Sequence, residues 1–430
     1  MTQDEYIVAN RTRRVEDVAL ELSRRKDLDA AFVLRQIEGY QRMRTKVVRW
    51  TEVEGIHFPP RLALEQCSGQ PAAEYKACVV SRLLRSECPV RGGSASAGPA
   101  FVDLTGGMGV DFSFIAPLFN TRTYVEQRAE LVEAARHNFP LLGLGDAEIV
   151  HGDGVEHLRA LPLLAEAPSL SGRAGGEALG EEGGLFIFLD PARRDANGGK
   201  TVLIEDCEPN IAELLPLLRA KGRITMVKLS PMLDLHRAIA MLHAVAPGCI
   251  SEVHVFAASG ECKDLLLVIT NEANADEPTI YCADEHGTFA FTQNEEATAT
   301  FALSSNPSGC LYEPGPALMK AGAFRSVAAR YGLAKLHTNS HLYVSPSPVA
   351  DFPGRGFEIV RTYTFAKADL KALVADLKSE GGKANLTVRN FPATVADLRK
   401  KLKIKEGGNT YLFATTDANE KKIIISCKKI

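Results

Sequence analysis

The segment best suited to chemistry is a glycine-rich turn that follows an apolar run. The run ends at Asp103, and Gly106, Gly107 and Gly109 come after it. Glycines let the backbone approach a ligand closely, and the helix that opens behind them directs its N-terminal amides toward that ligand. A dinucleotide site would need a third glycine where Phe112 stands, and Asp103 would repel a pyrophosphate. The turn therefore indicates a positively charged ligand; the alternative is a tight strand-to-helix turn that binds nothing.

Two further apolar runs end in polar residues. The second ends at Glu126, 23 residues after Asp103, where a carboxylate can accept both hydroxyls of a ribose. The third ends in His151-Gly152-Asp153, where a carboxylate can accept an adenine amino hydrogen. The alternatives are that Glu126 is a solvated helix cap and that Asp153 belongs to an ordinary turn.

The fourth run leads into the segment DPARR, whose first residue is Asp190. Asp190 can position an acceptor and receive its proton, and Lys228, at the end of the fifth run, can orient that acceptor. A structural lysine whose stem extends toward solvent is the alternative for Lys228. Arg193 and Arg194 can pair with a phosphate, or else form salt bridges to neighbouring acids. The segment at the end of the fifth run, residues 227–232, contains no cysteine, which argues against covalent attack on a pyrimidine ring carbon.

These residues require a sheet that brings the ends of the runs together. Short apolar runs alternate with helical windows, which predicts an α/β fold with a parallel sheet covered on both faces. The last two runs are close in sequence and predict an antiparallel hairpin that closes the sheet. The runs cover residues 100–104, 121–126, 147–151, 185–189, 224–229, 250–257 and 265–270.

The sequence on either side of this core has a different pattern of apolar and small residues. Before it, apolar spacings predict helices over 15–22, 30–40 and 62–84, and a small-residue linker over 91–100. A Gly- and Ala-rich stretch at 165–184 predicts a mobile insertion. After the core we expect one amphipathic helix over 317–331. Farther on we expect helices over 367–379 and 393–402, with strands near 383–389, 410–415 and 422–427.

Composition limits the class of protein. The 430 residues are 45% hydrophobic and 24% charged, as in a globular chain of two to four domains. No apolar stretch is long enough to span a bilayer, so we expect no membrane partner. The nine cysteines are scattered without CxxC spacing, and no secretory signal precedes them. We therefore expect a cytoplasmic protein without a metal site.

The net charge of −3 hides an uneven distribution. Residues 361–430 hold 15 Lys and Arg against 7 Asp and Glu, a net +8, whereas the rest of the chain holds 35 against 46, a net −11. A basic surplus of this kind favours a polyanionic partner, and a solvated charged face is the alternative. Phe391 is a candidate for stacking on a base or for the core. The predicted contacts to RNA are Arg194, Arg389, Lys400, Lys401 and Lys403.

Over residues 100–271 the order of strands and polar tips resembles the class I S-adenosylmethionine-dependent methyltransferases. Longer motifs extend the resemblance to bacterial methyltransferases with a ferredoxin-like segment and a C-terminal THUMP-like domain. These motifs are LALEQCSGQPAAEYKA at 62–77, LYEPGPALMKAGAF, HTNSHLYVS, DFPGRGF and the tail from ANLTVRNFPATV onward.

The resemblance implies a Rossmann-like sheet of six parallel strands and one antiparallel strand, flanked by a helical N-terminal region and small α+β modules. We expect the divisions 1–92, 98–272, 273–355 and 356–430. The cofactor S-adenosyl-L-methionine would be bound by Asp103, Thr105, Gly106, Gly107, Gly109, Asp111, Glu126, Gly152 and Asp153. Catalysis would involve Asp190, Pro191, Arg193 and Lys228.

The resemblance also implies methylation of RNA, either tRNA or rRNA, because THUMP domains accompany enzymes that modify tRNA. In relatives that methylate amino groups, Asp or Asn is followed by two prolines and an aromatic residue that stacks on the flipped base. Here Ala192 replaces the second proline and Arg193 the aromatic residue, so amino methylation of a base does not follow automatically. The rival hypotheses are an RNA-binding protein that has kept the cofactor fold without turnover, and a methyltransferase for small molecules or proteins.

Overall fold

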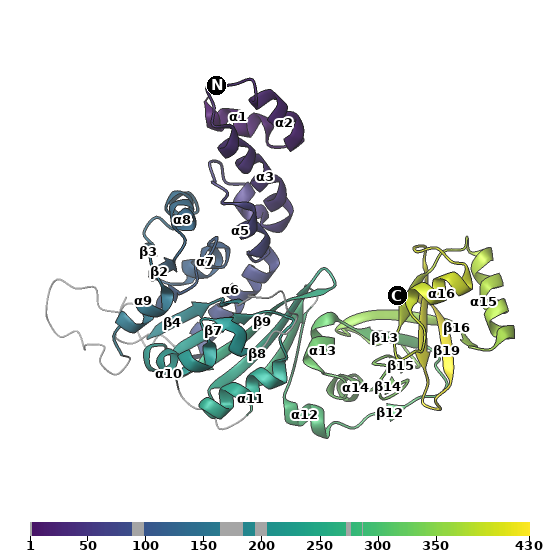
Figure 1. Ribbon diagram of the computed structural model, residues 1–430. Helices are drawn as coiled ribbons and strands as arrows, with labels where there is room; N and C mark the ends of the chain where they lie inside the picture. Colours follow the sequence, from purple (N-terminus) through teal and green to yellow (C-terminus); the bar gives the residue numbers. More distant parts are fainter. Residues whose placement is uncertain (1, 88–98, 164–183, 194–203, 272–276, 286) are drawn as a thin grey trace. The chain divides into compact units, whose positions relative to one another are not determined.

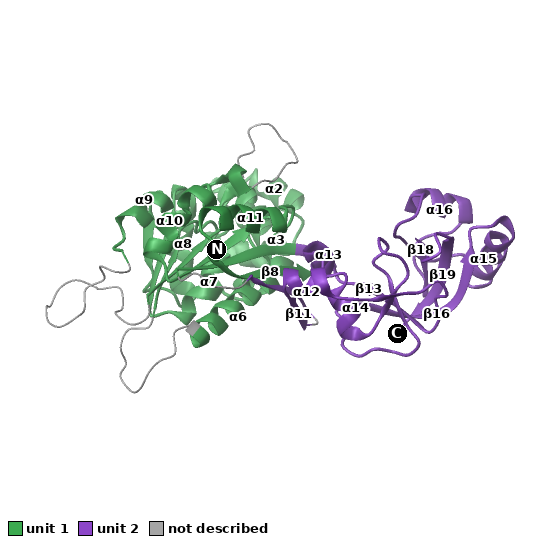
Figure 2. Cartoon of the chain, turned by 90° about the horizontal axis from the view of Figure 1, so that it is seen from below, with its two compact units in different colours: residues 1–258, 263–276 green, residues 259–262, 277–430 purple. Residues whose placement is uncertain are grey.

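The computed structural model describes the whole chain except residues 1, 88–98, 164–183, 194–203, 272–276 and 286. Its described residues form two compact units, coloured separately in Figure 2. Unit 1 comprises residues 1–258 and 263–276, and unit 2 comprises residues 259–262 and 277–430. Among the described helices none is both long and apolar enough to cross a membrane. The predicted linker and the predicted mobile insertion fall largely on residues that are not described.

Unit 1 is built on a twisted sheet whose strands lie in the order β8-β9-β7-β4-β1-β2-β3 (Figure 1). The pairs β4–β7, β1–β4, β1–β2 and β2–β3 are parallel, and β7–β9 is antiparallel. This arrangement confirms the predicted Rossmann-like α/β fold. The strands are β1 (Ala100–Asp103), β2 (Thr121–Glu126), β3 (Glu148–His151), β4 (Leu185–Leu189), β7 (Ile224–Leu229), β8 (Ile250–Ala258) and β9 (Glu261–Thr270).

The central strands form because their side chains are apolar on both faces. Every residue of β1 and β4 is buried, as expected for strands covered by helices on either side. Between β8 and β9 the chain reverses through Ser259 and Gly260, which both have positive φ, at 52° and 78°. Such two-residue turns are typical of antiparallel hairpins. The helices of this part are α7 (Val110–Ile115), α8 (Ala129–Leu141), α9 (Gly154–Ala160), α10 (Ile211–Lys221) and α11 (Leu235–Val245).

The N-terminal region is helical, as predicted, and belongs to unit 1. Its last helix, α6, packs against α7 and β8. The indole of Trp50 donates to Ser113 Oγ of α7 at 3.0 Å, and Tyr75 Oη lies 2.9 Å from His254 Nδ1 of β8. The helices are α1 (Gln3–Asn10), α2 (Val15–Leu22), α3 (Ala30–Lys46), α4 (Val48–Thr51), α5 (Arg61–Gln66) and α6 (Gln70–Glu87).

The prediction of one helix over 62–84 was wrong in one respect, because the segment is broken into α5 and α6. Cys67, which caps α5, has an extended backbone with ψ of 157°. Pro71 then stands in the first turn of α6, where a missing N–H costs nothing. The buried Ser68 lies in this break, where its side chain contacts Asp111 of α7 and Lys76 of α6.

Unit 2 contains an eight-stranded sheet in the order β12-β14-β15-β13-β16-β19-β18-β17. Its strands are β12 (Ala302–Leu303), β13 (Cys310–Pro314), β14 (Ala334–Lys335), β15 (Tyr343–Ser345), β16 (Gly354–Thr364), β17 (Asn385–Val388), β18 (Thr410–Thr416) and β19 (Lys422–Lys429). The hairpin β10 (Thr279–Asp284) and β11 (Gly287–Phe291) also belongs to this unit. The helices are α12 (Gln293–Thr298), α13 (Pro316–Ala321), α14 (Ser326–Tyr331), α15 (Lys367–Ser379) and α16 (Val395–Leu402).

The C-terminal elements confirm the predicted helices and strands, whereas the single helix over 317–331 was wrong. Gly322 ends α13 in the left-handed region at φ 79°, and α14 begins four residues later. The two short helices keep the apolar spacing of one longer helix, which is why the periodicity alone did not reveal the break.

Candidate active site

The predicted polar tips lie on four neighbouring strands of unit 1. β4, β1, β2 and β3 are adjacent in the sheet, and all four are parallel. Asp103 therefore lies at the same edge as Glu126, Asp153 and Asp190, each at or just beyond the end of its strand. This is the carboxyl edge, where open α/β sheets bind ligands.

The glycine turn has the geometry that its sequence suggested. Gly107 and Gly109 have positive φ, at 56° and 83°. At Gly106 a Cβ would come within 2.2 Å of the Tyr124 ring, and at Gly109 within 2.8 Å of Phe139. Each glycine is therefore required by backbone conformation or by close packing. Gly109 is also the N-cap residue of α7.

Asp103 is the last residue of β1 and is buried, with 1% of its surface exposed. Its Oδ1 accepts the Thr105 N–H at 3.0 Å. Burial raises the pKa of Asp103 well above its usual value; the Thr105 N–H opposes this, and the nearby carboxylates Asp111, Asp190 and Glu126 add to it. An acid held in this way gains most from a positively charged ligand.

Glu126 is half-buried at the tip of β2 and holds two loops together. One oxygen accepts the Gly107 N–H at 2.7 Å, and the other accepts the Arg128 N–H at 2.8 Å. A carboxylate has lone pairs for further donors, so these bonds are compatible with binding two hydroxyls. The bond to Gly107 couples the glycine turn to the second strand.

Asp153 acts as a helix cap in the structure. Its Oδ1 accepts the N–H groups of Val155 and Glu156 at 2.8 and 2.9 Å, and its Oδ2 accepts Gln127 Nε2 at 2.9 Å. This local geometry agrees with the alternative interpretation, in which His151-Gly152-Asp153 forms an ordinary turn before a helix. The side chain is exposed, and its role toward a cofactor remains a prediction.

Asp190 and Lys228 form an ion pair at the tips of β4 and β7. The Asp190 N–H also donates to Thr105 Oγ1 at 2.6 Å, which ties this tip to the glycine turn. Lys228 is mostly buried, with 11% of its side chain exposed. Because its ammonium group is paired with Asp190, Lys228 is not a structural lysine whose stem extends toward solvent.

The charges of this pair are set by opposing effects. Burial raises the pKa of Asp190, although the Lys228 ammonium counteracts it. Burial lowers the pKa of Lys228, but Asp190, Asp111 and Asp264 outweigh this and raise it above its usual value. Lys228 therefore stays an ammonium near neutral pH and cannot serve as a base.

The other predicted catalytic residues are placed less fully. Pro191 is buried directly after Asp190, and Arg193 lies in the short strand β5 (Ala192–Arg193), paired with β6 (Cys207–Glu208). Arg194 lies outside the described residues, so its proposed contact to phosphate stays a prediction.

The structure adds residues that the sequence reasoning did not assign. Lys76 of α6 is completely buried and pairs with Asp264 of β9 and with Asp111 of α7, the latter at 3.0 Å. Ser68 donates to Asp111 Oδ2 at 2.7 Å. Asp111, which was predicted to contact the cofactor, is therefore held by the N-terminal region. A lysine inside the apolar helical segment 62–84 was the signal for this cluster.

The acidic side chains of this edge outnumber the basic ones. Among the described residues that face it, Asp103, Asp111, Glu126, Asp190 and Asp264 are balanced by only Lys76 and Lys228. A surplus of carboxylates beside a glycine turn suits a cofactor that carries a positive charge. The residues present therefore fit S-adenosylmethionine better than a pyrophosphate-containing dinucleotide.

The predicted RNA-binding side chains of unit 2 differ among themselves. Lys400 and Lys401 lie exposed in the last turn of α16, and Lys403 follows as its C-cap. Lys401 Nζ lies 3.9 Å from the centre of the Phe365 ring. Cations in a last helical turn also favour the helix dipole, which is a structural reason for their presence.

Arg389 and Phe391 have partners within unit 2. Arg389 is half-buried and pairs with the buried Glu313 at 3.1 Å, so it is less available to a phosphate than the exposed lysines. Phe391 packs against the hydrophobic core of this part and meets Phe365 edge to face at 5.0 Å. The core interpretation of Phe391 accounts for these contacts.

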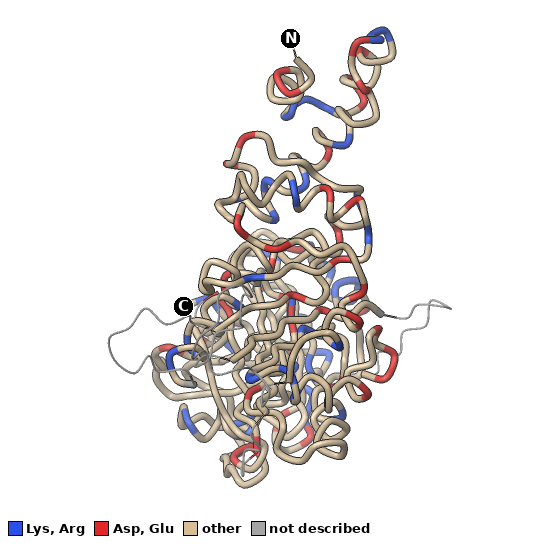
Figure 3. Tube along the Cα trace, turned by 90° about the vertical axis from the view of Figure 1, so that its left-hand side faces the viewer, with Lys and Arg blue, Asp and Glu red and all other residues tan. Residues whose placement is uncertain are grey.

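The N-terminal helices have both acidic and basic residues along their trace (Figure 3). Many of these are paired with each other, as in Arg13 with Glu21, Arg42 with Glu38 and Arg61 with Glu65. This region therefore does not offer a surface of a single sign.

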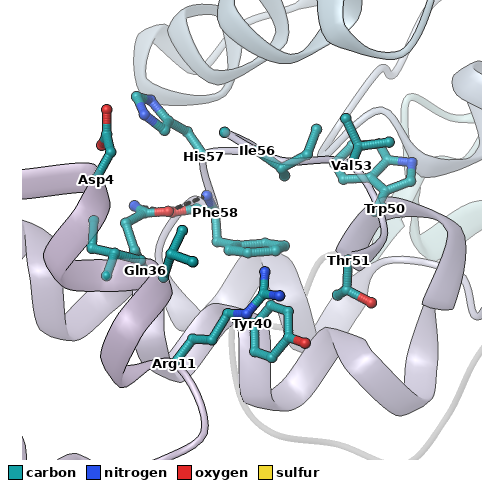
Figure 4. Close-up of a pocket in the computed structure, with 13 residues that line it drawn as sticks. Asp4, Arg11, Gln36, Tyr40, Trp50, Thr51, Val53, Ile56, His57 and Phe58 are labelled. Carbon is teal, nitrogen blue, oxygen red and sulfur yellow. Dashed lines mark hydrogen bonds between the residues drawn. The ribbon is translucent and has the colours of Figure 1, made fainter.

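A hollow in the N-terminal helices is shown in Figure 4. Two of its polar groups have partners: Gln36 bonds both backbone groups of Phe58, and the Arg11 guanidinium lies 4.5 Å from the centre of the Tyr40 ring. The hollow is lined by residues before the sheet begins, and it contains none of the strand-tip residues.

Comparison with known proteins identifies two domains in this chain and one structure that is similar over nearly its whole length. Residues 311–353 match a ferredoxin-like domain and residues 354–429 match a THUMP domain-like family. No curated protein matches the chain. A crystal structure of a Porphyromonas gingivalis W83 protein, assigned as a methyltransferase, is 31% identical with a TM-score of 0.80; the alignment covers 99% of this chain and 97% of that one.

Two human structures are also similar to part of this chain. The N-terminal domain of METTL16 in complex with SAH is 13% identical, with a TM-score of 0.35 over 63% of this chain and 95% of that one. The methyltransferase 10 domain containing protein is 14% identical, with a TM-score of 0.37 over 55% of this chain and 99% of that one.

Proposed function

Because the chain belongs to the family of class I methyltransferases that carry a ferredoxin-like and a THUMP-like domain, we propose that it transfers a methyl group from S-adenosylmethionine to RNA. The observation that carries this proposal is the Asp190–Lys228 pair, which lies beside the glycine turn at the carboxyl edge of the sheet. The four-part division at 92/98, 272/273 and 355/356 is part of the same proposal.

When bound, S-adenosylmethionine supplies a methyl group made electrophilic by its sulfonium. The chain contributes position and charge. Asp103 and the surrounding carboxylates favour a cation, the glycine turn admits a close ligand, and Glu126 offers acceptors for hydroxyl groups.

Asp190 holds the acceptor in line with the methyl group. As an anion, its carboxylate accepts a hydrogen bond from an N–H or O–H acceptor and takes up the proton that the acceptor releases. Lys228 orients Asp190 and keeps it ionised against the effect of burial. Neither a metal nor a covalent enzyme intermediate is part of this proposal.

RNA is the proposed substrate because the THUMP-like segment contains most of the basic surplus. Lys400, Lys401 and Lys403 are exposed on and beside α16, which leaves their ammonium groups accessible to a phosphate backbone. We propose a cytoplasmic enzyme that acts on tRNA or rRNA.

The substrate is tested by transfer of a tritiated methyl group to total RNA, protein and metabolite fractions. We expect label in the RNA fraction with the wild-type chain, and none above background with Asp190→Asn. Label confined to protein or metabolites would support the rival methyltransferase. RNA binding without label in any fraction would support a binding protein that has lost turnover.

The cofactor is tested separately by calorimetry. We expect S-adenosylmethionine to bind the wild-type chain and to bind Asp103→Ala at least about tenfold more weakly, because a buried acid that faces a cation is removed. Unchanged binding by Asp103→Ala would contradict the proposed site.

A further inference from the structure

Lys76 is the least expected charge in unit 1. It projects from α6 with 0% of its side chain exposed and pairs with two carboxylates, Asp264 and Asp111. Ser68 Oγ lies 3.2 Å from the same ammonium group. Lysine is almost never fully buried unless it is paired, so this residue needs an explanation beyond helix packing.

The register of the sheet places this cluster next to the proposed catalytic pair. Lys228 of β7 lies opposite Leu266 of β9, and Asp264 precedes Leu266 by two residues, so Asp264 and Lys228 share one face of the sheet. On the other side, Asp190 follows Leu189, which lies opposite Val227. Lys228 is therefore flanked by Asp190 and Asp264.

Charge balance shows what Lys76 does for this arrangement. Asp111 and Asp264 both act on Lys228 electrostatically, in addition to Asp190. Without Lys76, Lys228 would be the one ammonium group of the cluster for three carboxylates. Asp111 and Asp264 would then compete with Asp190 for it, and part of the surplus negative charge would be relieved by protonation.

We propose that Lys76 is a positioning residue for methyl transfer, which neutralises Asp111 and Asp264 and so leaves Lys228 to hold Asp190 as an anion. This inference rests on the proposed function of Asp190, and it makes the N-terminal region a part of the active site. Among the described residues, the titratable groups around Asp190 and its charged neighbours are Asp103 of β1, Asp111 of α7, Lys228 of β7, Asp264 of β9, Lys76 of α6 and the Cys67 thiol beside α5.

Anchoring of α6 does not by itself explain the buried lysine. The helix is already tied to the sheet by the ion pair of Arg82 with Glu252 and by the contact of Tyr75 with His254. Apolar residues dock a helix as well as a buried ion pair does, and without its desolvation cost. A buried charge that contacts two acids beside the reacting group is better explained by what it does to those acids.

The test compares Lys76→Met with Lys76→Met/Asp264→Asn. Loss of the cation alone raises the pKa of Asp190, so we expect the acidic limb of the kcat profile to move upward by about half a pH unit or more. The double variant removes one positive and one negative charge, and we expect its acidic limb to return toward that of the wild type. Arg82→Met is the matched control, because it removes another ion pair of α6, and we expect its pH profile to be unchanged.

A second measurement does not depend on turnover. Titration of ¹³C-labelled aspartate carboxyls by NMR, with the Asp190 signal assigned from Asp190→Asn, should show the same order of midpoints among the variants. A wild-type chain without turnover would overturn the proposed function, whereas the NMR titration would still decide the role of Lys76.

Two results would overturn the inference. One is an Asp190 midpoint in Lys76→Met equal to that of the wild type. The other is a double variant that shifts as far as Lys76→Met. If Lys76→Met does not fold, Asp264→Asn alone gives the opposite test: loss of a negative charge should lower the Asp190 midpoint, and an unmoved midpoint would contradict the proposal.

Discussion

The strand-tip site of unit 1 and the basic surface of unit 2 use charge in opposite ways. At the strand tips the charges are few and mostly buried, and each has a specific described partner, as Lys228 has in Asp190. The lysines on and just after α16 are exposed, and their charges are all positive and close together in the sequence. Buried charges are strongly coupled to their neighbours, whereas exposed charges are screened by water and salt. We therefore expect single changes to be decisive in the first region and graded in the second.

The largest effect is expected at Asp190. Asp190→Asn keeps the size of the side chain but removes its negative charge and its ability to accept a proton, so kcat should fall by about 10²- to 10⁴-fold. Single-turnover methyl transfer measures this, with a melting curve to show that the variant folds. A loss smaller than about tenfold would place the acceptor elsewhere.

The next largest effect concerns packing beside the site and compares two glycines. A Cβ at Gly154 would lie 2.0 Å from the backbone oxygen of Leu104, whereas at Gly152 the nearest atom is a Val150 methyl at 4.0 Å. Gly154→Ala should therefore lower the free energy of unfolding by about 1–3 kcal/mol or more, because backbone cannot move aside as a side chain can.

Gly152→Ala is the matched control, two residues away in the same turn. We expect its free energy of unfolding to change by less than about 0.5 kcal/mol. Urea unfolding of both variants measures the difference, and equal stabilities would contradict the close approach of α9 to β1.

Replacing Asp103 by Asn should have a smaller effect, which weakens binding of the cofactor but stabilises the ligand-free protein. Its pKa is raised in the folded chain, so its contribution to stability is greatest below the unfolded value of about 3.9 and is lost as the pH rises toward the folded pKa. At pH 7, Asp103→Asn should therefore raise the melting temperature of the ligand-free protein by about 2 °C or more while weakening S-adenosylmethionine binding.

The measurement is a melting curve at pH 5 and pH 7 for the wild type and Asp103→Asn. We expect the wild type to lose more stability than the variant between these two values. A variant that is less stable than the wild type at pH 7 would mean that the charged form is favoured by partners other than a ligand.

The smallest effect on stability is expected on α16. Replacing Lys400, Lys401 or Lys403 by Gln should leave the free energy of unfolding within about 0.5 kcal/mol of the wild type. If these lysines contact RNA, each loss should reduce the salt slope of RNA binding by about 0.7 for a single strand. Filter binding from low to high salt tests this, and three unchanged slopes would identify a solvated face.

The sequence contained much of the fold because its apolar runs are strand-sized and its helices amphipathic. It also marked the glycine turn, Asp190 and Lys228 as residues at the ends of apolar runs, but it did not predict that Asp190 and Lys228 pair with each other. Helix breaks were harder to predict: Cys67 and Gly322 interrupt patterns whose apolar spacing continues across the break. Periodicity reports which face is buried, and it does not report whether the backbone stays helical.

The partners of single charges were beyond prediction from the sequence. Nothing in local spacing indicates that Lys76 meets Asp264, 188 positions away, or that Arg389 meets Glu313. Such pairs depend on how helices pack on a sheet after the chain has folded. The sequence did mark one of them indirectly, since a lysine in an apolar helical face must find an anion or water.

Strand β16 has a consequence for how this family is divided. The ferredoxin-like match ends at residue 353 and the THUMP-like match begins at 354, where β16 starts. Yet β16 pairs with β13 on one side and with β19 on the other, and Glu313 of β13 binds both Arg355 and Arg389. A gene fusion or a proteolytic cut at 353/354 would leave β13 without its partner strand β16. It would also separate the buried Glu313 carboxylate from the guanidinium groups of Arg355 and Arg389. The ferredoxin-like and THUMP-like segments therefore share one eight-stranded sheet, and neither forms the complete sheet without the other.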